Sequence, residues 1–126
     1  MIGGIIVSHG PIAKAIIKAA ETILGPCTDV VAISTTGCAL KAVIEKIQHV
    51  IDIQKWEPGT VIMTSLKGGT CWNAAVTASK KNKQTTVVSG VNLPMLISFL
   101  TKRNQLPLDK LTQAIVQDAI RGIDQF

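Results

Sequence analysis

Short apolar runs alternate with amphipathic stretches along most of the chain. Four runs are rich in Ile, Val and Thr and predict strands at 2–7, 30–34, 60–64 and 85–89. Between and after them, apolar residues recur every three or four positions, which is the spacing of one helix face. This spacing predicts helices at 11–24, 39–53, 70–80, 92–102 and 108–121.

Individual residues mark the ends and inner faces of these helices. Thr70 and Asn92 are expected to cap the third and fourth helices, and Gly25-Pro26 ends the first. The face expected to point inward in the first helix comprises Ile12, Ile16, Ala20 and Ile23, with Ala13, Ile17 and Leu24 beside it. The corresponding residues are Leu40, Val43, Ile44, Ile47 and Ile51 in the second helix, and Leu111, Ile115, Ala119 and Ile120 in the last.

The order β-α-β-α-β-α-β-α-α predicts an α/β fold. Strands that alternate with helices form right-handed crossovers and a mainly parallel, four-stranded, doubly wound sheet with helices on both faces. The length of 126 residues suits a single domain, 1–126. In such a sheet, ligands bind beyond the carboxyl ends of the strands, where the strand order switches direction.

Composition narrows the functional classes. No apolar run is long enough to cross a bilayer, and no basic segment precedes the first apolar run as in a signal peptide, so we expect a cytoplasmic protein without membrane insertion. The net charge is +5, but the basic clusters at 79–84 and 101–104 lie where helices end and lack interleaved aromatic residues, which argues against nucleic-acid binding. Three cysteines without a CxxC pair predict free thiols and no cysteine-rich zinc site.

Four short loops, each containing glycine, should meet at the carboxyl edge of the sheet: 8–11, 35–38, 65–73 and 89–94. His9 lies in the first of them, directly before a helix. A neutral imidazole is a nucleophile near neutral pH and can carry a covalent intermediate. A phosphate on His9 would also meet the unpaired N–H groups and the positive dipole end of that helix.

A second helix start lies on the same edge. Gly68-Gly69-Thr70 can form a concave run of backbone N–H groups, Ser65 can hydrogen-bond an imidazole or a phosphate, and Lys67 can neutralise phosphate charge. The residues expected to line an anion site beside His9 are therefore Gly10, Ser65, Lys67, Gly68, Gly69 and Thr70.

Plainer interpretations stand beside these. His9 and Lys67 can be ordinary polar surface residues, and glycine suits many loops between a strand and a helix. His49, in the middle of the second helix, is read as exposed and structural. Cys38 and Cys71 fall on the same edge, where packing is the simpler role and thiol reactivity near His9 the alternative.

Three segments of the chain resemble the enzyme IIA domain of the mannose class of the sugar phosphotransferase system (PTS). They are GIIVSHGPIAKAIIKAAETILG (4–25), KGGTCWNAA (67–75) and SGVNLPML (89–96). The resemblance implies that His9 takes a phosphoryl group from the phosphohistidine of HPr and passes it to a histidine of an enzyme IIB domain. No metal or diffusible cofactor is needed for such a transfer.

The same resemblance implies the details of the fold and assembly. The strand order is expected to be 2-1-3-4. The chain is expected to form a homodimer in which a C-terminal antiparallel strand, here 121–126, is exchanged between subunits.

The sequence departs from the family pattern near the histidine. Family members commonly carry an aspartate where this chain has Ser65, and often an aromatic residue where it has Lys67. Without that carboxylate, His9 should be less basic and its phosphorylated form longer-lived. The departure keeps open a regulatory, non-transport IIA paralogue that senses the state of the phosphorelay. A flavodoxin-like or nucleotide-binding domain is disfavoured by the few aromatic residues and by the absence of a P-loop or GxGxxG motif.

Overall fold

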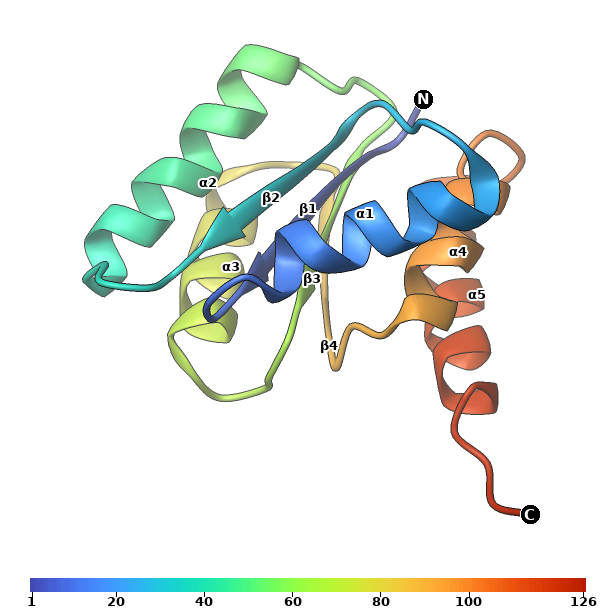
Figure 1. Ribbon diagram of the computed structural model, residues 1–126. Helices are drawn as coiled ribbons and strands as arrows, with labels where there is room; N and C mark the ends of the chain where they lie inside the picture. Colours follow the sequence, from blue (N-terminus) through green and yellow to red (C-terminus); the bar gives the residue numbers. More distant parts are fainter.

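Four parallel strands form one sheet, and the computed structural model describes the chain over residues 1–126 (Figure 1). The strands are β1 (Gly3–Ser8), β2 (Val30–Ser34), β3 (Thr60–Thr64) and β4 (Thr85–Ser89), in the order β2-β1-β3-β4. The helices are α1 (Ile12–Leu24), α2 (Leu40–Gln54), α3 (Thr70–Lys81), α4 (Leu93–Lys102) and α5 (Leu108–Arg121). This confirms the doubly wound α/β fold and the strand order that the resemblance implied.

The two central strands send alternate side chains into two separate cores. In β1, Ile6 packs in one core, while Ile5 and Val7 pack in the other. In β3, Met63 and Ile62 divide in the same way. Because successive side chains of a strand point to opposite faces, an uninterrupted apolar strand requires cover on both sides.

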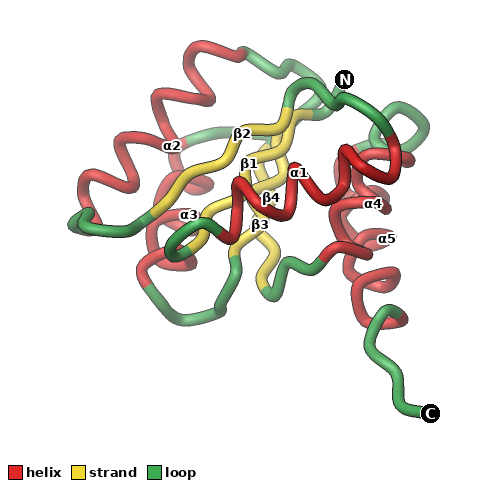
Figure 2. The backbone as a smooth tube through the Cα atoms, viewed as in Figure 1, coloured by secondary structure: helices red, strands yellow, loops and turns green.

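Helices supply that cover unequally. Helices α1, α4 and α5 contribute to the first core, and α2 and α3 to the second (Figures 1 and 2). The second core uses small side chains where α3 meets the sheet, namely Cys71, Ala74, Ala75 and Ala78. Helix α3 can therefore lie close to the strands, and its first turn lies close to the loop that follows β1.

The chain leaves the two central strands in opposite directions. From β1 it passes through α1 to β2, and from β3 it passes through α3 to β4 on the other side of the sheet. The loops after β1 and β3 therefore diverge from neighbouring strand ends. This is the switch point at which doubly wound sheets bind ligands.

Some boundaries and faces differ from the sequence prediction. Strand β1 begins one residue later than predicted and extends to Ser8, which pairs with Ser34 of β2. In α1 only Ala13 and Ala20 are buried, and the prediction that Ile12, Ile23 and Leu24 point inward was wrong. The helix packs a narrow stripe against its neighbours, so apolar residues at the border of that stripe stay exposed. Leu40 and Ile120, which were also expected to point inward, are exposed as well.

The C-terminal segment forms no strand in the single chain. Residues 123–126 are irregular and exposed, and they lead away from the body of the molecule (Figure 1). Strand β4 lies at one edge of the sheet, so its outer backbone groups have no neighbouring strand. Exchange of this segment between subunits stays a prediction, because a strand needs a partner to pair with.

No helix of the fold combines the length and the apolar character that crossing a membrane requires.

Candidate functional site

His9 stands at the carboxyl end of β1, on the first residue after the strand. Its side chain is exposed, whereas the preceding Ser8 is fully buried. The hydroxyl of Ser8 accepts a hydrogen bond from the Ala13 N–H (2.7 Å), in the first turn of α1. Ser8 thus anchors the start of the helix and holds the intervening loop, so that the imidazole projects at the edge of the sheet.

Gly10 shapes this loop rather than offering a donor to a ligand. Its φ of 55° lies in the left-handed region that favours glycine. Its N–H donates to Thr36 Oγ1 (2.9 Å), in the loop after β2. The expectation that the start of α1 presents several free N–H groups to a phosphate was therefore partly wrong, because those of Gly10 and Ala13 already have acceptors.

The start of α3 is the more open anion cradle. Gly69 takes the N-cap position without a side-chain cap, and Thr70 is the first helical residue, not the cap as predicted. The backbone N–H groups of Thr70, Cys71 and Trp72 have no acceptor within the chain. Such groups, at the positive end of the helix dipole, favour a bound anion.

The imidazole lies beside this cradle. A Cβ placed on Gly69 would lie 4.0 Å from His9 Cε1, an ordinary contact distance, so the ring lies next to the start of α3. Gly68 turns the chain with a φ of 87°. The structure therefore brings Gly69 and the first turn of α3 to His9.

Ser65 forms no hydrogen bond with the imidazole, which was one of its two expected roles; a hydrogen bond to a phosphate stays a prediction. Its hydroxyl lies 4.0 Å from Cys71 Sγ, and the thiol in turn lies 3.7 Å from His9 Nδ1. Cys71, for which packing was the simpler interpretation, is thus the side chain in contact with the ring. Its place directly after Gly-Gly-Thr was a usable signal, because the second residue of a helix can face the loop that the helix packs against.

Lys67 is exposed and lies away from hydrogen-bonding partners. Its Nζ is 6.0 Å from the centre of the Trp72 ring. The residue lies on the same loop as the glycines, but the structure records no contact between its ammonium group and His9. Its charge can act on a phosphate there only across solvent.

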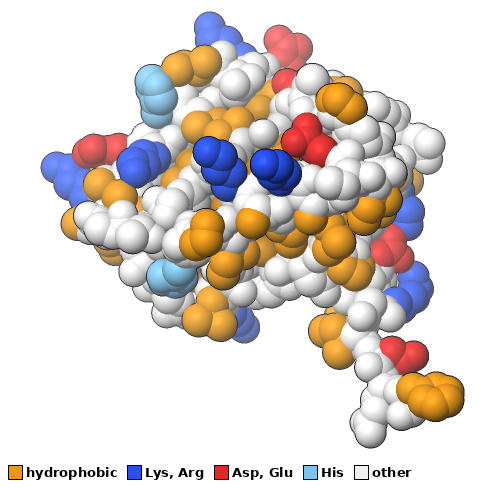
Figure 3. Space-filling model, in the orientation of Figure 1, with side chains coloured by type: hydrophobic (Ala, Val, Ile, Leu, Met, Phe, Trp, Pro, Cys, Tyr) orange, Lys and Arg blue, Asp and Glu red, His pale blue; other side chains and the backbone are white.

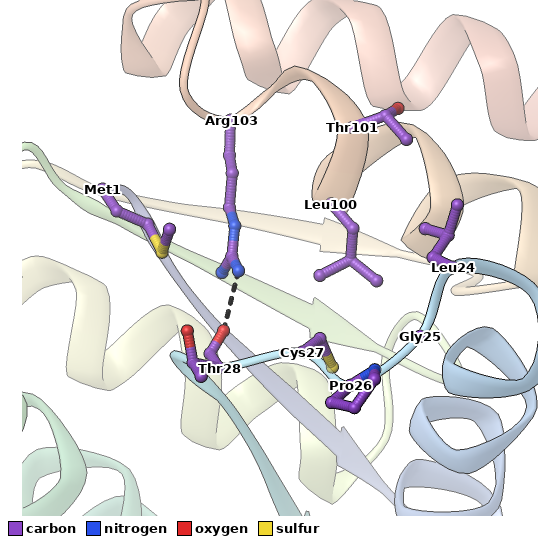
Figure 4. A pocket seen from close by; sticks show the side chains of 9 residues that line it. All are labelled: Met1, Leu24, Gly25, Pro26, Cys27, Thr28, Leu100, Thr101 and Arg103. Atoms are coloured by element: carbon purple, nitrogen blue, oxygen red, sulfur yellow. Dashed lines mark hydrogen bonds between the residues drawn. The ribbon is translucent and has the colours of Figure 1, made fainter.

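The side chain of His9 lies outside the larger hollows of the molecule. Hollows of 340 to 420 Å³ occur elsewhere on the molecule, and His9 lines none of them. The hollow shown in Figure 4 lies at the opposite, amino end of the sheet, where Arg103 points from the end of α4 toward the Thr28 carbonyl. The His9 imidazole is therefore accessible from the surface and not enclosed in one of these hollows.

The remaining candidates have plain roles. His49 is exposed on α2, as expected, and the two histidines are well separated on the surface (Figure 3). All three cysteines are free thiols; Cys38 Sγ accepts a hydrogen bond from Lys46 Nζ (3.2 Å). The structure contains no group of three or more His, Cys, Asp and Glu side chains arranged to hold a metal ion.

Comparison with known proteins places this geometry in a family. The family model described as "PTS system fructose IIA component" (EIIA-man) matches residues 3–116, which is most of the chain. This chain belongs to the EIIA-man family of PTS IIA components. As a IIA component it is a sugar-specific phosphotransferase component of the PTS.

Individual relatives agree. The IIA chain is 32% identical over 114 residues to the sorbose-specific EIIA component of Lacticaseibacillus casei, covering 90% of this chain and 82% of that protein. It is 29% identical over 121 residues to the mannose-specific EIIAB component of Escherichia coli strain K12, covering 94% of this chain but only 38% of that protein.

Among solved structures, the EIIA component of Streptococcus agalactiae superposes with a TM-score of 0.92 at 28% identity. The match covers 100% of this chain and 98% of that one. The IIA chain therefore shares its whole fold with a known PTS component.

Proposed function

We propose that this IIA chain carries a phosphoryl group on His9 within a sugar PTS. The phosphohistidine of HPr donates the group and a histidine of an enzyme IIB domain receives it. In each step the N–P bond of the donor breaks as an N–P bond to the acceptor imidazole forms. Because the bond broken and the bond formed are alike, alignment and charge stabilisation are the main requirements.

The observation that carries the proposal is the position of His9. Its exposed imidazole lies at the switch point of the sheet, next to a helix start whose first three N–H groups have no internal acceptor. In this proposal, these N–H groups stabilise the charge on the oxygens of a phosphoryl group attached to the ring. Gly68 and Gly69 keep side chains out of that space.

The test is phosphorylation in a reconstituted relay. The chain is incubated with phosphoenolpyruvate, enzyme I and HPr, and its intact mass is measured. We expect a mass increase of one phosphoryl group that is lost in His9→Ala and retained in His49→Ala, the matched control at the second exposed histidine. Label that persists in His9→Ala, or that disappears in His49→Ala, contradicts the assignment.

One observation favours a second candidate, a regulatory IIA paralogue. His9 forms no ion pair with a carboxylate, and Ser65 occupies the position where the family commonly has an aspartate. A slower phosphoryl donor suits a sensor of relay state. Addition of cognate enzyme IIB to the phosphorylated chain separates the two: rapid transfer supports transport, and retention of the label on His9 supports regulation.

The proposal includes a cytoplasmic location and a homodimer. Support for the dimer comes from the free edge of β4 and from the exposed C-terminal segment, in which Ile123 is 76% exposed. Light scattering should give twice the chain mass, and a chain ending at Gly122 should be monomeric. A full-length monomer at micromolar concentration contradicts the dimer but leaves the role of His9 unaffected.

A further inference from the structure

A buried thiol lies beneath the exposed imidazole. Cys71 is fully buried in the first turn of α3, and its Sγ lies 3.7 Å from His9 Nδ1. We propose that Cys71 is a positioning residue: its thiol holds the His9 ring with the proton on Nδ1 and leaves Nε2 as the nucleophile. The benefit to phosphoryl transfer rests on the proposed function, but the state of the ring does not.

The direction of each hydrogen bond follows from the group at the buried end of the chain of contacts. The chain of contacts ends at the carbonyl oxygen of Ser8, which can only accept. Thr35 Oγ1 lies 3.4 Å from that oxygen and donates to it. Having donated its one proton, the Thr35 hydroxyl can only accept from its other neighbour, Cys71 Sγ, at 3.8 Å.

The thiol has one proton, and Thr35 Oγ1 is an acceptor for it. With S–H donating to Thr35, the sulfur lone pairs face the remaining neighbours, Ser65 Oγ at 4.0 Å and His9 Nδ1 at 3.7 Å. A sulfur that accepts requires a proton on the nitrogen it faces. The network therefore favours the tautomer with Nδ1–H, although each contact to sulfur is a weak hydrogen bond.

This tautomer is the one the reaction needs. A neutral imidazole that carries its proton on Nδ1 has its free lone pair on Nε2. Since Nδ1 faces the buried thiol, Nε2 is the nitrogen left to the exposed side of the ring. When Nε2 bonds to phosphorus and the donor N–P bond breaks, the proton stays on Nδ1 and no proton has to move.

The thiol differs from a carboxylate in one respect that matters here. Both can accept a hydrogen bond from Nδ1–H, but a neutral thiol places no negative charge near the phosphoryl group. Cys71 thus orients the ring, as a carboxylate would, without repelling the phosphorylated form.

The test measures which nitrogen of the His9 ring carries the proton. Long-range ¹H–¹⁵N NMR of the unphosphorylated chain, at a pH where His9 is neutral, distinguishes Nδ1–H from Nε2–H, with His49 in the same spectrum as an internal control. We expect mainly Nδ1–H at His9. Cys71→Ala should lower the ratio of Nδ1–H to Nε2–H by roughly threefold or more, as expected for loss of a net hydrogen bond, and Cys71→Ser should restore it.

Thr35→Val provides an independent variant. It removes the acceptor of the thiol proton, so the thiol can turn and donate to Nδ1, and the ratio should fall as in Cys71→Ala. Folding should survive, because the Ser8 carbonyl keeps its hydrogen bond from the Thr35 N–H (2.9 Å).

The outcomes separate the two proposals. A ratio at His9 that is unchanged in both Cys71→Ala and Thr35→Val overturns the role of Cys71. A ratio that falls in these variants, in a chain that takes no phosphoryl group at His9, supports the role of Cys71 while the proposed function fails. If both hold, phosphorylation by HPr should slow in Cys71→Ala, with the apparent KM for phospho-HPr unchanged, and recover in Cys71→Ser.

Discussion

Glycines at the two ends of the sheet differ in how closely other atoms surround them. At the carboxyl end, Gly10, Gly37, Gly68 and Gly90 all have positive φ, and a Cβ on any of them would meet nothing within 4 Å. At the amino end, a Cβ on Gly3 would lie 1.8 Å from Trp56 Cδ2, and one on Gly59 would lie 2.9 Å from Leu108 Cδ2. The glycines at the carboxyl end thus provide positive φ in open space, whereas close packing leaves no room for a side chain at Gly3 and Gly59, of which Gly59 also has a positive φ of 129°.

The two ends of the sheet also differ in how completely their polar groups are hydrogen-bonded. At the amino end, the guanidinium group of buried Arg103 donates to the Thr28 carbonyl (2.8 Å) and the Asp29 carbonyl (3.3 Å), and it lies over the Phe99 ring. The hydrogen bond from Trp56 Nε1 to the Asp29 carboxylate lowers the pKa of Asp29. At the carboxyl end, by contrast, the N–H groups of the first turn of α3 stay free. Substitutions at the amino end should therefore cost stability, and those at the carboxyl end should change chemistry.

The largest effect is expected for Gly3→Ala. The new methyl group would overlap the Trp56 ring, which is held by its hydrogen bond to Asp29, so we expect a loss of about 3 kcal/mol in the free energy of unfolding. Gly69→Ala is the matched control, because the only contact of its Cβ is His9 Cε1 at 4.0 Å; it should cost less than about 1 kcal/mol. Urea denaturation measures both, and equal losses would remove the contrast between the two ends.

Arg103→Met should be the next most damaging. It leaves the Thr28 carbonyl without a donor, whereas the Asp29 carbonyl keeps its hydrogen bond from the Gly4 N–H (2.9 Å). Because the variant keeps much of the aliphatic contact with Phe99, we expect a loss of about 2 kcal/mol. Arg121→Met is the control, since Arg121 pairs with Asp118 at the surface with its side chain 72% exposed; its loss should stay near 0.5 kcal/mol. Thermal or urea unfolding measures both losses. A smaller loss for Arg103→Met than for the control would refute a stabilising role of Arg103.

At the carboxyl end, Ser65→Asp should alter the phosphorylated state more than the fold. Under the proposed function, a carboxylate near His9 makes the ring more basic and repels the phosphoryl group. We expect about 1 kcal/mol of added repulsion, or about fivefold faster loss of the phosphoryl group. Intact mass followed over time measures the decay, with Ser65→Asn as the neutral control. Equal or slower loss in Ser65→Asp would show that charge at this position does not limit the lifetime.

The smallest effect is expected for Asp118, which lies at neither end of the sheet and provides a reference for the stability measurements. Asp118 of α5 accepts hydrogen bonds from Lys102 and Ser98 of α4, and these contacts hold its pKa at about 2, below the ordinary 3.8. The ionised carboxylate therefore stabilises the fold fully above pH 3.8, and this contribution is lost as the pH falls toward 2. The urea midpoint should fall over this range, and fall less in Asp118→Asn. An identical pH dependence in both chains would exclude a role for Asp118.

Much of the architecture was predictable because both faces of the sheet are buried. When both faces of a strand are buried, a short apolar run predicts the strand without any alternation of apolar and polar residues. The expected bounds of β2, β3 and β4 agree with the structure. The Asn92 cap was also predictable, because its side chain acts on the N–H of Met95, only three residues away (2.9 Å). Exposure on α1 was not, since Ile12 and Ile16 carry the same side chain and differ only in what the tertiary fold places beside them.

By itself, the sequence determined the order of the elements and the presence of His9 at the end of the first strand, where glycine-rich loops meet. These depend on residue spacing and on local backbone preferences. Only the tertiary structure decided that Cys71, and not Ser65, lies against His9 Nδ1, and that Thr35 and Ser8 complete the chain of contacts. His9 and Cys71 are 62 residues apart, and their distance depends on how closely the alanines of α3 let that helix approach the sheet. Such packing depends on all the elements together and cannot be read from any one segment.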